Sequence, residues 1–196
     1  MIKRAVTAAA ASAVLLAADL ALGGSPASAY ATFGHKLTYG VGNYGSSTQH
    51  YYIDSSASGY VSMINTAMDQ WIYTTGPWNI TTPISYTRTT TKSSSRMDHY
   101  LSSNIHDWWG LTTFWSGDAT VDPSAKNWVW NKVWMDGDFA NCPNQRGVIA
   151  HEQGHAMGLA HVSSGTAVMR TTIGQGGLNN ITRAQPDDLN GINHLY

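Results

Sequence analysis

HEQGHAMGLAH, residues 151–161, gathers three histidines, two glycines and the only glutamate of a 196-residue chain. On an α-helix, residues four apart lie on one face, so His151 and His155 direct their imidazoles towards a common point. Gly158 follows three residues after His155, where a left-handed turn ends a helix at no Cβ penalty. The chain then reverses, which allows His161 to bring a third nitrogen to the same point.

Three histidine nitrogens and a free fourth position are the ligand pattern of a catalytic zinc ion, whereas structural zinc sites close with four protein ligands. Glu152 follows the first histidine, so its carboxylate lies beside the metal but too far round the helix to be a ligand. The stretch therefore predicts Zn²⁺ on His151, His155 and His161, with Glu152 as the general base. Two alternatives stay open, namely chance spacing in an ordinary core helix and a site that has lost its metal.

The motif and its flanks resemble the metzincins and, within them, the matrixins, the matrix metalloproteinase group. HEQGHAMGLAH is followed eight residues later by Met169 in AVMR, which looks like the metzincin signature with its methionine turn. KLTYGV from Lys36, the helix ending at Trp71 and the C-terminal PDDLNGINHLY are similar to the start and the closing helix of a matrixin catalytic domain. The resemblance implies that Met169 is a hydrophobic floor beneath the histidines and not a ligand.

The fold implied by this resemblance is an α/β fold (an α+β zincin) with a twisted five-stranded mixed sheet and three helices. One antiparallel edge strand, sought in Leu111–Trp115, would border the cleft. Strand chemistry predicts strands at 36–41, 84–90, 97–101, 111–115 and 129–135, and helical spacing predicts helices at 60–72, 144–158 and 186–194. The Gly/Ser/Tyr-rich segment up to about Gly59 reads as a loop. Alternation places Trp128 and Trp130 on one strand face.

The N-terminus has the three parts of a secretory signal peptide. MIKR is basic, a largely apolar run follows, and Ala27-Ser28-Ala29 is a small-x-small cleavage pattern. A membrane anchor is the alternative, but the apolar run meets Asp19 short of the roughly 20 residues that a span needs. We expect residues 1–29 to be a signal peptide and 30–196 to be the catalytic domain of a secreted, extracellular protein without membrane contact after cleavage. We also expect no latency pro-segment.

The charge and the cysteine content limit which binding partners and crosslinks are expected. The formal net charge of −1 gives no bulk attraction to nucleic acid or anionic lipid, so no nucleic-acid partner is expected. The resemblance to the matrixins implies a protein or peptide substrate. The single cysteine, Cys142, excludes an internal disulfide and is expected to pack as a small apolar residue. Contact with the metal and pairing between molecules stay open for this thiol. We expect a monomer.

Further metal sites have weaker signals. Many matrixins hold a second zinc and calcium ions in a long loop, and the corresponding region here has only His99, His106 and Asp107 before the central motif. The loop looks truncated, and the alternatives for these residues are exposed loop positions or a hydrogen-bonded histidine. Asp136-Gly137-Asp138 offers carboxylates to Ca²⁺, but two aspartates fall short of the six to eight oxygens that calcium takes.

Two rival functions follow from the same residues. Eight tryptophans are a feature of sugar-binding surfaces, so a secreted carbohydrate-binding module with a structural zinc is one rival. A zinc hydrolase acting on something other than protein is the other. The resemblance places the wall of the substrate pocket at Thr171–Arg183, which does not reveal the pocket preference. The sequence thus predicts a secreted zinc endopeptidase, and Glu152→Gln separates it from a binding module.

Overall fold

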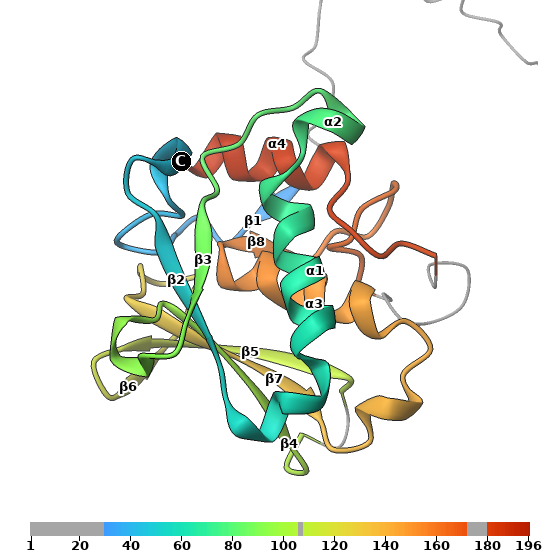
Figure 1. Ribbon diagram of the computed structural model, residues 1–196. Coiled ribbons are helices and arrows are strands. Elements are labelled where there is room, and N and C mark those ends of the chain that lie inside the picture. Colours follow the sequence, from blue (N-terminus) through green and yellow to red (C-terminus); the bar gives the residue numbers. More distant parts are fainter. Residues whose placement is uncertain (1–29, 106–107, 172–179) are drawn as a thin grey trace, which may run out of the picture.

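A computed structural model describes residues 30–105, 108–171 and 180–196 of the chain (Figure 1). Its main element is a six-stranded sheet in the order β3-β2-β4-β7-β5-β6. The strands of this sheet are β2 (Gln49–Ile53), β3 (Tyr86–Thr89), β4 (Met97–Ser102), β5 (Gly110–Ser116), β6 (Ala119–Val121) and β7 (Trp130–Asp136). A second, two-stranded sheet pairs β1 (Ala31–Thr32) with β8 (Leu159–Ala160).

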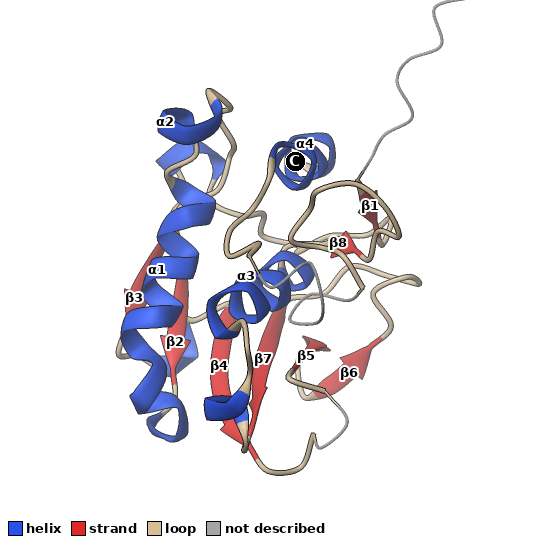
Figure 2. Ribbon diagram, turned by 90° about the vertical axis from the view of Figure 1, so that its right-hand side faces the viewer, coloured by secondary structure: helices blue, strands red, loops and turns tan. Residues whose placement is uncertain are grey.

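The chain has three long helices in its described part, as predicted, and they pack against these sheets. A further helix has one turn only. The helices are α1 (Val61–Ile72), α2 (Thr75–Trp78), α3 (Gln145–Ala156) and α4 (Pro186–Leu195). Short 3-10 helices are η1 (Asn43–Gly45), η2 (Ser55–Tyr60), η3 (Lys92–Ser94) and η4 (Phe139–Asn141). Figures 1 and 2 show α4 beside the small sheet formed by β1 and β8. None of the helices within the described ranges combines the length and apolar character that crossing a bilayer requires.

The sheet is mixed, as predicted, and β5 is the one strand that runs against the others within the described residues, but a sixth strand, β6, lies beyond it at the edge. β3, β2, β4 and β7 run parallel, whereas β5 pairs antiparallel with both β7 and β6. The extra strand β6 pairs only with Phe114–Ser116, the last three residues of β5. Within the described part of the chain, Gly110–Thr113 therefore has a strand partner on the β7 side alone, and its other edge is open.

The strand predicted at 36–41 is wrong, and the first strand of the main sheet lies in the predicted loop. Leu37 forms only an isolated bridge with Trp128, and Gly40 and Gly42 take φ angles of 72° and 123° that end the extended backbone. The strand forms instead at QHYYI, Gln49–Ile53, where buried and half-buried residues alternate. A strand, a helix and a strand still follow one another in this part of the chain, as β2, α1 and β3.

Helix α3 lies in the core because it has partners on two sides. Its residues from Gly147 to Ala156 are all buried. On one side α1 packs against it, and the indole Nε1 of Trp71 donates to the Ala150 carbonyl at 3.1 Å. On the other side lies β5, whose Thr112 hydroxyl contacts the backbone carbonyl of Glu152 at 2.9 Å. This double support fixes the helix that carries the central motif (Figure 2).

Candidate metal centre

The central motif forms a helix and a reversal, as the spacing predicts. α3 begins after Asn144, whose side chain accepts from the Gly147 backbone N–H at 3.0 Å. The helix continues to Ala156, and Gly158 then takes a φ of 111°, which favours glycine. A Cβ at this position would lie 2.8 Å from a methyl carbon of Leu195. After the reversal the chain passes through β8 to His161, whose side chain points back towards α3.

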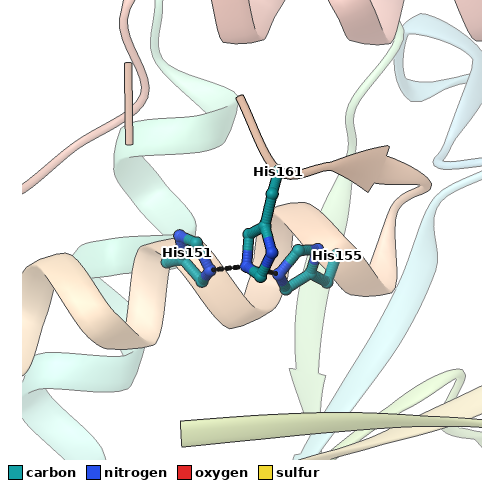
Figure 3. Close-up of side chains that lie close together, drawn as sticks. All are labelled: His151, His155 and His161. Carbon is teal, nitrogen blue, oxygen red and sulfur yellow. Dashed lines mark hydrogen bonds between the residues drawn. The ribbon is translucent and has the colours of Figure 1, made fainter. Parts of the chain in front are cut away.

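The three histidines meet at one point (Figure 3). The Nε2 atom of His161 lies 3.1 Å from that of His151 and 3.0 Å from that of His155. One ligand atom from each residue lies within 4.8 Å of the others, and among the described residues this is the one such group of three His, Cys, Asp or Glu. A tetrahedral zinc with nitrogens at roughly 2.0–2.1 Å separates its ligand atoms by about 3.3 Å, so the spacing is close to what zinc needs.

The outer ring nitrogens fix which tautomers are present. Nδ1 of His151 donates to the Val168 carbonyl at 2.7 Å, and Nδ1 of His155 donates to the Leu159 carbonyl at 2.8 Å. Both protons are thereby on the outer nitrogens, and both Nε2 atoms present lone pairs to the centre. A neutral His161 has one proton at most to share between two acceptors. The donor set therefore fits a cation at the centre better than a hydrogen-bonded cluster.

The environment keeps these rings neutral. Burial, followed by the charge of His161, lowers the pKa of His151 to about 4 against the hydrogen bond to Val168. Burial and the two neighbouring histidines lower the pKa of His155 far below its usual value, and burial also lowers the pKa of the more exposed His161. Neutral imidazole is the form that binds metal ions.

Glu152 lies beside the histidines on the floor of the cleft. Its carboxylate oxygen Oε2 accepts from the Thr112 hydroxyl on β5 at 2.8 Å. Burial raises the pKa of Glu152 to about 7, and the hydrogen bond from Thr112 opposes this rise. Gly110 leaves room for the side chain, because a Cβ there would lie 2.7 Å from the Glu152 Cγ and 2.9 Å from its Oε1. No sequence pattern points to Thr112 or Gly110 as a partner of Glu152.

A cleft of about 660 Å³ passes over this centre. The open half of β5 forms one wall, and the histidines and Glu152 form the floor. Phe33 from the N-terminal segment lines the cleft beside His155, with ring centroids 5.7 Å apart. Trp109, Val148 and two aspartates also line the cleft.

Met169 lies against the histidine helix, as the resemblance implies. Its side chain is 1% exposed, and a Cβ on Gly154 would overlap its sulfur atom. The preceding residue, Val168, provides the carbonyl that orients His151. The turn that contains Met169 therefore supports the centre through packing and through one hydrogen bond.

Asp188 holds this turn in place, a role that no sequence pattern predicts. Its Oδ2 accepts from the backbone N–H groups of Val168 and Gln185, each at 2.8 Å, and its Oδ1 accepts from Met169 at 3.3 Å. The same carboxylate completes the capping box at the start of α4. From the sequence, Asp188 can be recognised only as a helix cap. A cap does not predict contact with a turn 20 residues away.

We expect Asp188→Asn to lower the free energy of unfolding by about 3 kcal/mol. Asparagine offers one acceptor oxygen, and its amide nitrogen would face a backbone N–H group in the buried turn. Urea unfolding monitored by tryptophan fluorescence measures the change. The adjacent Asp187→Asn is the matched control, since it removes a first-turn carboxylate with a helix-dipole contribution of about 0.5 kcal/mol. Equal losses in the two variants would contradict the role of Asp188.

At the weaker predicted sites, no group of three metal-binding side chains forms among the described residues. His99 is buried in β4, where Nδ1 lies 3.2 Å from the Tyr52 carbonyl and Nε2 lies 3.2 Å from the side-chain nitrogen of Gln153. It is the hydrogen-bonded histidine of the alternative interpretation, and His106 and Asp107 lie outside the described residues. Asp136 and Asp138 line the cleft with no third carboxylate close enough, within the described ranges, for the group that calcium needs.

Cys142 is a buried free cysteine of the main core, as predicted. Burial raises the pKa of its thiol. The thiol is not part of the histidine group.

Comparison with known proteins gives one family. The model of the family described as Matrixin, a peptidase family, matches residues 32–196. The matched range contains the histidine motif, Met169 and α4. None of the curated proteins matches the chain.

Proposed function

The chain belongs to the matrixin family of zinc metalloendopeptidases, and from this premise we propose that His151, His155 and His161 hold the catalytic zinc and that Glu152 is the general base. The observation that carries this assignment is the convergence of three neutral imidazole nitrogens beside a buried carboxylate in an open cleft. When bound, zinc acidifies water and polarises a carbonyl group.

Glu152 moves the proton in this proposal. Its Oε1 side faces the space next to the Gly110 backbone, and Oε2 is held by Thr112. The carboxylate takes a proton from the attacking water and then passes it to the departing amine, so one group acts as base and as acid. Thr112 orients the carboxylate, because its hydroxyl lies within hydrogen-bonding distance of both the carbonyl and the side chain of Glu152.

Protein or peptide substrates bind along β5 in this proposal. The edge at Gly110–Thr113 has backbone groups available for pairing, and it lies along the cleft. An extended peptide adds to such an edge through main-chain hydrogen bonds, which depend little on its sequence. Specificity must then come from the side-chain pockets of the cleft.

The experiment that tests the function is cleavage-site profiling on a peptide library, with and without a chelator. We expect cleavage by the zinc-loaded protein, loss of cleavage with the chelator, and recovery when zinc is added back. The rival binding module and the non-peptidase hydrolase are not retained, because the matched family is one of peptidases. Failure to cleave any peptide with zinc bound would overturn the proposed function.

We further propose that the protein is secreted and that residues 30–196 act extracellularly as a monomer. The basic, apolar and small-x-small parts of residues 1–29 support this proposal. N-terminal sequencing of protein collected from the growth medium tests it, with Tyr30 as the expected first residue. The expected absence of nucleic-acid and membrane partners stays a prediction.

Gly110→Ala tests the space that Glu152 occupies. The new methyl group would lie 2.7 Å from the Glu152 Cγ and 2.9 Å from a methyl carbon of Val148, so the carboxylate must shift. We expect kcat to fall by about 100-fold, since a 1 Å misplacement of a reacting group costs that much. Gly76→Ala is the control, because nothing lies within 4 Å of a Cβ there. Equal kcat values in the two variants would contradict this account of Gly110.

A further inference from the structure

The end of the cleft beside Val148 carries two carboxylates that the proposed mechanism does not use. Asp136 and Asp138 both line the cleft there. Asp136 is the last residue of β7, and its backbone N–H donates to the Trp109 carbonyl at 3.1 Å. Val148 precedes His151 by three residues on α3, about one helical turn. The aspartates therefore lie where the cleft extends from the histidines towards the N-terminal half of α3.

The Asp136 carboxylate is buried and has an unused acceptor. The residue is 7% exposed, and its Oδ1 accepts from the Asp138 backbone N–H at 2.7 Å. Its Oδ2 is buried without a hydrogen-bond partner. No lysine or arginine is among the described residues that line the cleft. Oδ2 therefore lacks the hydrogen bond that would compensate its burial, and no cationic side chain among the described residues of the cleft supplies an opposite charge.

A basic side chain of a substrate supplies the positive charge and the hydrogen-bond donors that this corner of the cleft lacks. Lysine and arginine combine an apolar stem with a cationic head that donates several hydrogen bonds. Trp109 and Val148 offer apolar surface to such a stem, and Asp136 and Asp138, which line the same cleft, offer carboxylates to the head. An apolar side chain of the same length would fill the corner while leaving the Asp136 oxygen desolvated and unpaired.

Resting on the proposed peptidase function, we propose that Asp136 and Asp138 select substrates with a lysine or arginine flanking the scissile bond. The position is adjacent to that bond because Val148 and Gly110, which border the corner, also contact the Glu152 region of the floor. Asp136 contributes the buried partner of the cation, and the exposed Asp138 contributes a second, more solvated charge. The substrate class is therefore basic peptides.

A matched peptide series tests the preference on the zinc-loaded protein. The peptides differ only at one residue flanking the scissile bond, on either side in turn, and this residue is lysine, arginine, norleucine or citrulline. We expect kcat/KM for lysine or arginine to exceed that for norleucine or citrulline by about 100-fold at one of the two positions. Citrulline keeps the shape of arginine without its charge, so this comparison isolates the cation.

Variants of Asp136 and Asp138 test whether these carboxylates cause the preference for basic residues. Asp136→Asn keeps an oxygen for the Asp138 N–H and removes the charge, and we expect it to bring the lysine-to-norleucine ratio of kcat/KM close to one. Asp138→Asn lowers the ratio less, because this carboxylate is more exposed. Asp118→Asn, on the exposed turn between β5 and β6, is the matched control that leaves the ratio unchanged. If Asp136→Asn does not fold, the wild-type series and Asp138→Asn decide.

Binding gives a second readout that does not need turnover. Titration of zinc-loaded Glu152→Gln with the same peptides, followed by tryptophan fluorescence, should show tighter binding of the lysine peptide than of the norleucine peptide. Equal kcat/KM and equal binding for both peptides would overturn the inference while leaving the peptidase function intact. Absence of cleavage throughout the series would instead overturn the proposed function.

Discussion

Glu152→Gln is expected to lower kcat for peptide hydrolysis by about 10³- to 10⁴-fold, the range that a general base contributes at its upper end. Glutamine has nearly the same shape, and its amide oxygen still accepts from the Thr112 hydroxyl that Oε2 contacts at 2.8 Å. It has no carboxylate to take a proton from water. The three histidines are unchanged, so zinc content should remain that of the wild type.

Two measurements separate this role from a structural one. Metal analysis after gel filtration reports zinc content, and kcat is measured at saturating peptide. Asp69→Asn makes the same change of carboxylate to amide on the exposed face of α1, and we expect it to keep the wild-type kcat. A zinc-loaded Glu152→Gln that retains more than about a tenth of the wild-type kcat would contradict the general-base assignment.

The convergence of the three histidines was predictable because its geometry is local. His151 and His155 share a helical face by the four-residue rule, and Gly158 has the left-handed backbone that its position after the last helical turn suggests. The third nitrogen, that of His161, belongs to the same stretch, so spacing within eleven residues is sufficient to predict that the three side chains converge. The three long helices were predictable for the same reason, since periodicity and caps are written in consecutive residues.

The missed strand shows where local patterns fail. KLTYGV from Lys36 has strand chemistry, but Gly40 within it and Gly42 directly after it take positive φ angles that turn the chain, and no strand of the main sheet forms there. Trp128 and Trp130 were predicted on one face, and this is wrong. Trp128 packs on Phe114 in the core, with ring centroids 4.7 Å apart, whereas Trp130 stacks on Trp115 at 5.4 Å. β7 begins only at Trp130, so strict alternation does not extend back to Trp128.

The supporting residues were not predictable, because each acts across the fold. Thr112 reaches Glu152 from a strand 40 residues earlier in the sequence, and Asp188 reaches the methionine turn from α4. The cleft position of Asp136 depends on the pairing of β5 with β7, which brings Trp109 beside the end of β7. No spacing rule connects such residues, so their roles appear only when the strands and helices are assembled.

His161→Ala is expected to weaken zinc binding by more than 100-fold and to abolish peptide cleavage at zinc concentrations that saturate the wild type. Loss of a residue that only supports a metal ligand costs 10- to 100-fold in affinity or activity, as a rough range, so loss of the ligand itself should cost more. His161 makes both of the short Nε2 contacts of the centre, at 3.1 and 3.0 Å. Without it, two nitrogens of α3 remain, fewer than a catalytic zinc site uses.

Zinc-dependent stability gives this prediction a readout other than activity. Binding to the folded state alone should raise the free energy of unfolding of the wild type by about 4 kcal/mol at a free zinc concentration 1,000 times Kd. At the same concentration, His161→Ala should gain about 1.4 kcal/mol or less, because its Kd is more than 100-fold higher. His50→Ala is the matched control, since His50 lies on β2 and contacts the Thr87 hydroxyl at 3.1 Å, away from the centre. Urea unfolding with buffered zinc measures all three proteins, and an equal gain for His161→Ala and His50→Ala would contradict a metal held by three histidines.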